Sequence, residues 1–335
     1  MLPSVPLHAG SSAECILLVA LACTAGASAV VAFGRAWPER SLLRWAALIA
    51  TYLCATLALM LVAHALAGRG AWVVSSYAVM LVISVLIAWA LVVPRLTTMG
   101  LPLQLVFYMI FGCLLLGILG SRVAHALSEL AYGAPDVELV AQLVDRSRAG
   151  LGIFGAIAVD LLFLVVLFRL HPEHSLARSL DASTPAIALN VAVGRIGCLL
   201  AGCCYGAVVE PNLFSMPVAA FARDSPAGAA YRELPDASIW ATQLLEMMAV
   251  FAIAGACELL YRRRRQLGLR DGTVIAFAAA SYGGVRGLLE LLRADSARPF
   301  AGQFTIWQVL SLALCGATLG WLMWASRSRP ARRPA

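Results

Sequence analysis

Runs of apolar residues dominate the chain and are separated by polar stretches. A helix needs roughly 20 apolar residues to cross the hydrocarbon core of a membrane. Nine runs are about this long: 13–33, 43–66, 72–93, 102–120, 150–169, 185–204, 239–261, 272–291 and 305–325. The pattern therefore predicts an all-α, polytopic membrane protein.

Two longer polar segments interrupt the apolar runs, at 121–149 and 206–238. Both are long enough to form arms or a lid on one side of the membrane. Secondary transporters typically contain an inverted repeat, and the two halves of this chain show none. A transporter is therefore not the favoured class.

Composition and charge agree with this class and add an orientation. The chain is 61% hydrophobic and 13% charged, whereas a soluble domain is about 25% charged. Every basic residue is arginine, and arginines concentrate in alternate loops, at 35–44, 94–100, 169–179, 261–270 and in the tail. Basic loops stay cytoplasmic, so we expect the N-terminus outside and the C-terminus in the cytoplasm.

The two ends of the chain carry weak signals of other functions. No arginine precedes Arg35, so a secretory signal with a basic start is not expected. The ALAC sequence at 20–23 faintly resembles a lipoprotein cleavage site, which we attribute to chance. The arginine-rich tail lacks the motifs of nucleic-acid binding, and we expect no nucleic-acid partner.

Ionisable side chains inside the predicted spans mark candidate functional positions, because each costs about 2.5–3.5 kcal/mol to insert. Arg195 is one. Tyr282, Arg286, Glu290 and Arg293 follow at spacings that place them on one stripe of a helix. The planar guanidinium group of arginine is well shaped to bind a phosphate, and a nearby glutamate can orient that group or transfer protons. The alternative is a buried structural salt bridge.

Glycine pairs suggest how these arginines are brought together. Gly202 with Gly206, and Gly283 with Gly287, have the spacing that lets helices approach closely in lipid. We expect this approach to bring Arg195 near Arg286. Two converging arginines repel unless an anion lies between them, which favours an anionic phospholipid headgroup.

Six motifs together resemble a known family. They are SYA at 76–78, GSRV at 120–123, GRIG at 194–197 followed by Gly202 and Gly206, ATQLLE at 241–246, YGGVR at 282–286 followed by Glu290 and Arg293, and Gln308 with Ser311. Their order and spacing are similar to those of the bacterial prolipoprotein diacylglyceryl transferases. The resemblance covers about 70–325.

The resemblance implies a seven-helix transferase-like core at 68–326, preceded by a two-span extension at 1–67 and followed by a basic tail at 327–335. It implies transfer of the diacylglyceryl group of phosphatidylglycerol to the lipobox cysteine of exported preproteins. The product released is glycerol 1-phosphate. The implied location is the bacterial inner membrane, and no cofactor or metal is expected.

The resemblance also implies roles for particular residues. Arg195 and Arg286 match the family's essential arginines, and Glu290 matches its helix glutamate. The residues expected to bind substrate are Tyr77, Gly194, Gly197, Cys198, Gly202, Cys203, Gly206, Gln243, Glu246, Tyr282 and Arg293.

Three departures from the family pattern leave a second function open. Cys198 replaces an asparagine, Cys203 replaces an acid and Phe154 replaces a histidine. His125 is our candidate for the missing base, with Glu290 or the acidity of the substrate thiol itself as alternatives. The second function is a non-catalytic or repurposed phospholipid-binding protein on the same fold.

Cys198, Cys203 and Cys204 form the last unusual feature of this region. Small, polarisable cysteines often serve as packing residues, and this is the interpretation we favour. Thiol chemistry or metal binding is the alternative, but the spacing is not C-x₂-C and no histidine is near.

Overall fold

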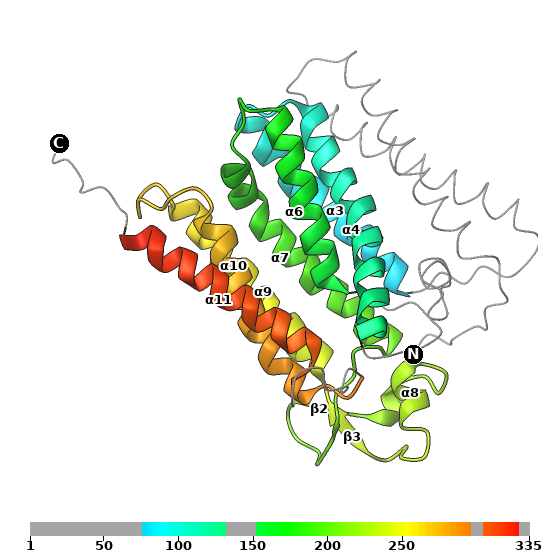
Figure 1. Cartoon of the computed structure of the whole chain (residues 1–335). Helices are drawn as coiled ribbons and strands as arrows, with labels where there is room; N and C mark the ends of the chain where they lie inside the picture. Colours follow the sequence, from blue (N-terminus) through cyan, green and yellow to red (C-terminus); the bar gives the residue numbers. More distant parts are fainter. Residues whose placement is uncertain (1–75, 132–151, 296–303, 328–335) are drawn as a thin grey trace, which may run out of the picture. The chain divides into compact units, whose positions relative to one another are not determined.

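The computed structural model describes residues 76–131, 152–295 and 304–327, which belong to two compact units. The first unit contains α3 (Ser76–Thr98), α7 (Leu176–Ala201), α9 (Thr242–Arg263), α10 (Thr273–Leu289) and α11 (Ile306–Arg327) (Figure 1). The second contains α4 (Leu103–Ala131) and α6 (Ile153–Leu170). Each predicted span from residue 72 onward corresponds to one of these helices.

Six helices in the described part of the chain are long and apolar enough to cross a membrane: α4, α6, α7, α9, α10 with its 3₁₀ extension Glu290–Leu292, and α11. The apolar part of α3, Val82–Thr98, is shorter. These helices confirm an all-α polytopic membrane protein. The predicted spans 13–33 and 43–66 lie outside the described residues.

Two helix boundaries differ from those that hydropathy predicts. α4 continues to Ala131, so the segment that begins at 121 starts as helix and not as an outer polar arm. α7 begins at Leu176 and not at 185, because the Ser175 side chain accepts a hydrogen bond from the Arg178 amide. This cap satisfies an amide that the helix itself leaves unpaired.

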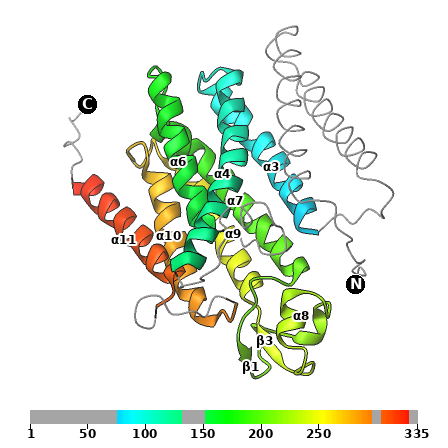
Figure 2. The same cartoon turned by 45° about the vertical axis from the view of Figure 1, so that its right-hand side comes forward.

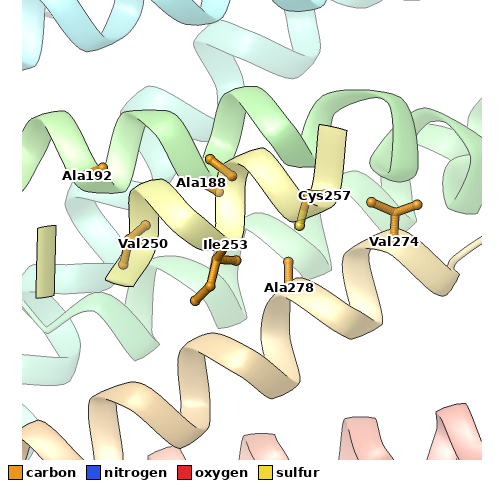
Figure 3. Packing of buried hydrophobic residues seen from close by; sticks show 8 residues of the cluster. Ala188, Ala192, Val250, Ile253, Cys257, Val274 and Ala278 are labelled. Atoms are coloured by element: carbon orange, nitrogen blue, oxygen red, sulfur yellow. The ribbon is translucent and has the colours of Figure 1, made fainter. Parts of the chain in front are cut away.

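Small side chains let α7, α9 and α10 pack closely. Ala188 and Ala192 of α7 face Val250 and Cys257 of α9, and α10 adds further apolar residues to the same cluster (Figure 3). In lipid, where the surroundings are as apolar as the protein core, association depends on such close packing. The cluster fixes the three helices on which the candidate site is built.

Asp181 joins α7 to the start of α10 and was not identified from the sequence. Its carboxylate accepts hydrogen bonds from the amides of Gly272 at 2.8 Å, Val274 at 3.0 Å and Ile275 at 3.0 Å. The first amides of a helix have no partner within that helix, and a membrane offers no water to replace one. Asp181 therefore caps α10 from a neighbouring helix.

Replacing Asp181 should destabilise the first unit. We expect Asp181→Ala to cost about 1–3 kcal/mol or more, because buried amides lose their acceptors. Asp271→Ala is the matched control, since Asp271 forms an exposed 3.3 Å ion pair with Arg178, and such pairs contribute little. Thermal unfolding in detergent measures both, and equal melting temperatures for the two variants would contradict the capping role.

The two glycine pairs have different roles. A methyl group on Gly283 would lie 2.7 Å from the Ser311 carbonyl oxygen of α11, so this glycine does permit close helix approach. Gly202 and Gly206 do not pack two helices together, because α7 ends at Ala201. The expectation that the glycine pairs bring α7 against α10 is therefore wrong, since Gly283 faces α11.

In the second unit, glycines again allow a close helix contact. A methyl group on Gly120 of α4 would lie 2.6 Å from the carbonyl oxygen of Gly155 on α6. The Gly152 amide donates to the Ser121 carbonyl at 3.0 Å. The GSRV motif therefore lies at the contact between these two helices.

The polar segment between α7 and α9 folds into a small head. β1 (Val208–Val209), β2 (Ser215–Pro217) and β3 (Ser238–Trp240) form an antiparallel sheet in the order β1-β3-β2. Two short helices, η1 (Val218–Ala220) and α8 (Pro226–Ala230), pack beside it (Figure 2). The predicted arm or lid is thus a compact structure with its own apolar core.

Candidate functional site

The end of α7 explains the mixture of glycine and cysteine in GRIGCLLAGCCYG. Gly202 adopts a left-handed conformation with φ of 67°. Its amide donates to Leu199 at 3.2 Å, and the Cys203 amide donates back to the Cys198 carbonyl at 3.1 Å. This pattern is the Schellman motif, which ends a helix and reverses the chain.

The loop after this turn is held by hydrogen bonds to its carbonyl groups. Thr242 and Gln243, at the start of α9, donate to the carbonyls of Cys204 at 2.6 Å and Cys203 at 2.7 Å. The Ala227 amide of α8 donates to the Gly202 carbonyl at 2.9 Å. The three carbonyls from 202 to 204 are thus fixed by the head and by α9.

The segment after α10 pairs with the same loop. The Ala207 amide donates to the Leu292 carbonyl at 2.8 Å, and the Ala294 amide donates to the Tyr205 carbonyl at 3.2 Å. A bridge between Gly206 and Arg293 lies between these bonds. The sequence around Arg293 is therefore placed beside the end of α7.

Arg195 lies at the centre of a buried polar cluster. Its Nη2 atom contacts Glu246 Oε1 of α9 at 2.6 Å and lies 3.5 Å from the Tyr282 hydroxyl of α10. That hydroxyl donates to the same Glu246 oxygen at 3.2 Å. Three helices thus contribute one side chain each, and Glu246 is only 2% exposed.

Arg286 and Glu290 form a second buried pair, one turn further along. Arg286 Nη1 lies 2.8 Å from Glu290 Oε2. The contact lacks the alignment of a hydrogen bond, so Nη1 remains buried without a hydrogen-bond acceptor in the described structure. Thr305, at the start of α11, donates to Glu290 Oε1 at 3.1 Å.

Arg293 departs from the predicted stripe. α10 ends at Leu289 and Glu290–Leu292 form a 3₁₀ turn, after which Arg293 is extended. Arg293 forms a bidentate pair with Asp295, at 2.9 and 2.6 Å, and its Nε lies 3.7 Å from Glu290 Oε2. It therefore joins the cluster from the chain segment beyond the helix.

The expectation that an anion must lie between the converging arginines is wrong. Three guanidinium groups, those of Arg195, Arg286 and Arg293, are matched by the carboxylates of Glu246, Glu290 and Asp295. The arginines are held in place by these carboxylates. An anion is therefore not required to keep the cluster neutral, although the arginines still offer oriented donors.

The three cysteines converge beside Arg195. Their sulfur atoms all lie within 4.8 Å of one another, and Arg195 Nη1 lies 3.6 Å from Cys204 Sγ and 3.8 Å from Cys198 Sγ. Hydrogen bonds from Cys198 and Cys203 hold the pKa of Cys204 well below its usual range, and Arg293 and Arg195 lower this pKa further. The same thiol contacts raise the pKa of Cys203. The two arginines therefore favour the charged form of the Cys204 thiol.

Most of the predicted site residues in the first unit meet in this region. They are Arg195, Cys198, Gly202, Cys203, Gly206, Gln243, Glu246, Tyr282, Arg286, Glu290 and Arg293. Gly197 is buried in α7, whereas a methyl group on Gly194 would meet open space. Tyr77 lies in the first turn of α3, and its side chain lies outside the described residues.

Other predicted residues belong to the second unit, and some participants were not predicted. His125 is half-buried on α4, and Phe154 lies in the first turn of α6. The sequence analysis did not identify Thr305 or Asp295 as site residues. Thr305 precedes the motif residue Gln308, and Asp295 follows the motif residue Arg293. Asp295 follows Arg293 by two residues, and this short acid–base spacing was the available signal.

These features define a class: a multi-pass membrane protein with a buried arginine and carboxylate cluster at the ends of apolar helices. The family model for prolipoprotein diacylglyceryl transferase matches residues 64–324. The chain belongs to this family, which makes it a bacterial transferase by family membership.

Known relatives carry the same description. The phosphatidylglycerol–prolipoprotein diacylglyceryl transferase of Clostridium tetani is 27% identical over 65% of this chain and 80% of its own length. That of Frankia alni is 30% identical over 69% of this chain and 58% of its own length. The phosphatidylglycerol–prolipoprotein diacylglyceryl transferase 2 of Clostridium perfringens is 28% identical over 66% of this chain and 79% of its own length.

Proposed function

We propose that the protein transfers the diacylglyceryl group of phosphatidylglycerol to the lipobox cysteine of exported preproteins. Membership of the family supports this reaction. The single observation that carries the proposal is the buried cluster of Arg195, Glu246, Tyr282, Arg286 and Glu290 at the positions of the family motifs.

The arginines are suited to the leaving group. When the cysteine sulfur attacks the glyceryl carbon next to the phosphate oxygen, the carbon–oxygen bond breaks and glycerol 1-phosphate leaves with the electron pair. Negative charge then develops on that oxygen, and preorganised donors stabilise it. Arg286 Nη1, buried without a hydrogen-bond acceptor in the described structure, is the donor that we assign to the phosphate.

A second polar atom is suited to the headgroup. Gln243 is 1% exposed, and its Nε2 atom donates to Cys203, while its Oε1 atom has no hydrogen-bond partner in the described part of the chain. An unpaired buried acceptor is costly. A hydroxyl of the phosphatidylglycerol headgroup would satisfy it.

The thiol must also lose its proton, since the thiolate is the nucleophile. We propose His125 as the base, because histidine is the side chain best suited to proton transfer near neutral pH. His125→Gln should lower the transfer rate, because a glutamine amide cannot accept the thiol proton. Initial rates in proteoliposomes with a lipobox peptide measure this, and an unchanged rate would assign the proton to Glu290 or to the thiol's own acidity.

We propose that the core inserts with its N-terminus outside and its C-terminus in the cytoplasm of the bacterial inner membrane, as the arginine-rich loops indicate. Residues 1–67 would then be an extension with two spans. The start of the family match at residue 64 supports this division. Deleting 1–67 removes an even number of spans, so the orientation of the core should be kept, and a reversed cysteine-accessibility map would contradict it.

Complementation in cells depleted of their own transferase tests the proposed function. The gene should restore lipidation of a reporter preprotein, whereas an Arg286→Ala variant should not. A phospholipid-binding protein without transfer is the second candidate, favoured by Phe154, Cys198 and Cys203 at motif positions. Normal membrane insertion with no lipidated reporter would support it.

A further inference from the structure

The most distinctive feature outside the transfer chemistry is the group formed by Cys198, Cys203 and Cys204. Their sulfur atoms lie within 4.8 Å of one another, and they are the only set of potential metal ligands of this kind in the described residues. In the sequence, a metal site was disfavoured because the spacing of the cysteines is not C-x₂-C and no histidine is near. The reversal at Gly202 removes the objection from spacing, since it folds Cys203 and Cys204 back over Cys198.

We propose that these three thiols form a binding site for Cu(I). Thiolate ligands select soft ions such as Cu(I) over harder divalent ions. Structural zinc sites almost always have four ligands, whereas three thiolates satisfy Cu(I), which accepts trigonal coordination. The three sulfurs lie within 4.8 Å of one another, and the described residues add no fourth ligand to this group.

The backbone around the thiols is preorganised for such a site. The carbonyls of Cys203 and Cys204 accept hydrogen bonds from Gln243 and Thr242, and the Cys203 amide is held by the Cys198 carbonyl. Cys204 has a φ of 60°, the only non-glycine residue with positive φ in the described part of the chain. A left-handed conformation is costly for a residue with a side chain, so the surrounding bonds must hold it.

Two guanidinium groups lie near the thiols, although each also pairs with a carboxylate, Arg195 with Glu246 and Arg293 with Asp295. A Cu(I) ion bound by three thiolates forms a complex with a net charge of −2. Arg195 lies 3.6 Å from Cys204 Sγ and 3.8 Å from Cys198 Sγ, and Arg293 acts electrostatically on Cys204. Buried charges require such compensation.

Cu(I) binding can be measured on the full chain without any transfer assay, so its failure is separate from failure of the proposed transferase activity. The purified protein, reduced with a phosphine in detergent, is titrated with Cu(I) from a coloured chelate complex. We expect one Cu(I) per chain, and X-ray absorption should find sulfur as its only ligand type.

Cys198→Ser, Cys203→Ser and Cys204→Ser should each weaken Cu(I) binding at least tenfold. Cys113→Ala and Cys315→Ala are matched controls, since both are half-buried cysteines outside the group, and they should bind as the wild type does. Helical content by circular dichroism identifies any variant that fails to fold, and Cys203→Ala provides a second test that removes the thiol without adding a hydroxyl group. No uptake by the reduced wild type, or equal loss in the controls, would overturn the site.

Discussion

Arg195→Ala should abolish most of the transfer activity. Loss of one preorganised donor at a developing negative charge typically costs about 10²–10³-fold in rate. Arg195→Lys should rescue poorly, because an ammonium group lacks the planar fork with which Arg195 reaches Glu246, Tyr282 and two cysteines at once. Initial rates in proteoliposomes with a lipobox peptide measure both variants.

The same change also removes the partner of a buried carboxylate, so stability must be separated from catalysis. Breaking a buried ion pair costs about 3–5 kcal/mol, and Glu246 lies 2.6 Å from Arg195. Adding Glu246→Gln should restore the melting temperature of the Arg195→Ala variant without restoring its activity. Recovery of activity together with stability would show that Arg195 serves only the fold.

Gly283→Ala should disrupt the packing of α10 against α11. Its added methyl group would lie 2.7 Å from the Ser311 carbonyl and 3.0 Å from the Cys315 amide nitrogen, both backbone atoms that cannot move alone. Overpacking of this kind costs about 1–3 kcal/mol. Because Glu290 is held by Thr305 at the start of α11, transfer activity should fall as well.

The adjacent glycine provides a matched control. A methyl group on Gly284 would meet only the Cys315 sulfur at 3.9 Å. Gly284→Ala should therefore leave the melting temperature unchanged or raise it, since alanine favours a helix by about 0.5–1 kcal/mol over glycine. Equal destabilisation by the two substitutions in thermal unfolding would contradict the close contact between α10 and α11.

Hydropathy was sufficient to predict the helices of the described region, because a membrane span must be both apolar and long. It placed the start of α7 nine residues too late, since it could not detect the Ser175 cap. Asp181 was not identified from the sequence for a similar reason. Its function is to accept hydrogen bonds from a helix 91 residues away, and no local pattern reveals such a partner.

The site residues were largely identified by motif, but their pairing was not. The sequence placed Arg195 and Arg286 in spans, yet it gave no indication that Glu246 would be the partner of Arg195. The cysteines show the same limit. Whether residues five apart meet depends on where the helix ends, and that end is set by the backbone conformation of Gly202.

Mass spectrometry of a lipobox peptide tests the central claim most directly. The purified, reduced protein is placed in vesicles that contain phosphatidylglycerol, and the peptide and the released glycerol phosphate are followed together. The account predicts that the peptide cysteine gains one diacylglyceryl group for each glycerol 1-phosphate released, and that Arg195→Ala with Glu246→Gln gives neither product. An unmodified peptide in the presence of folded wild-type protein that binds phosphatidylglycerol would contradict the account.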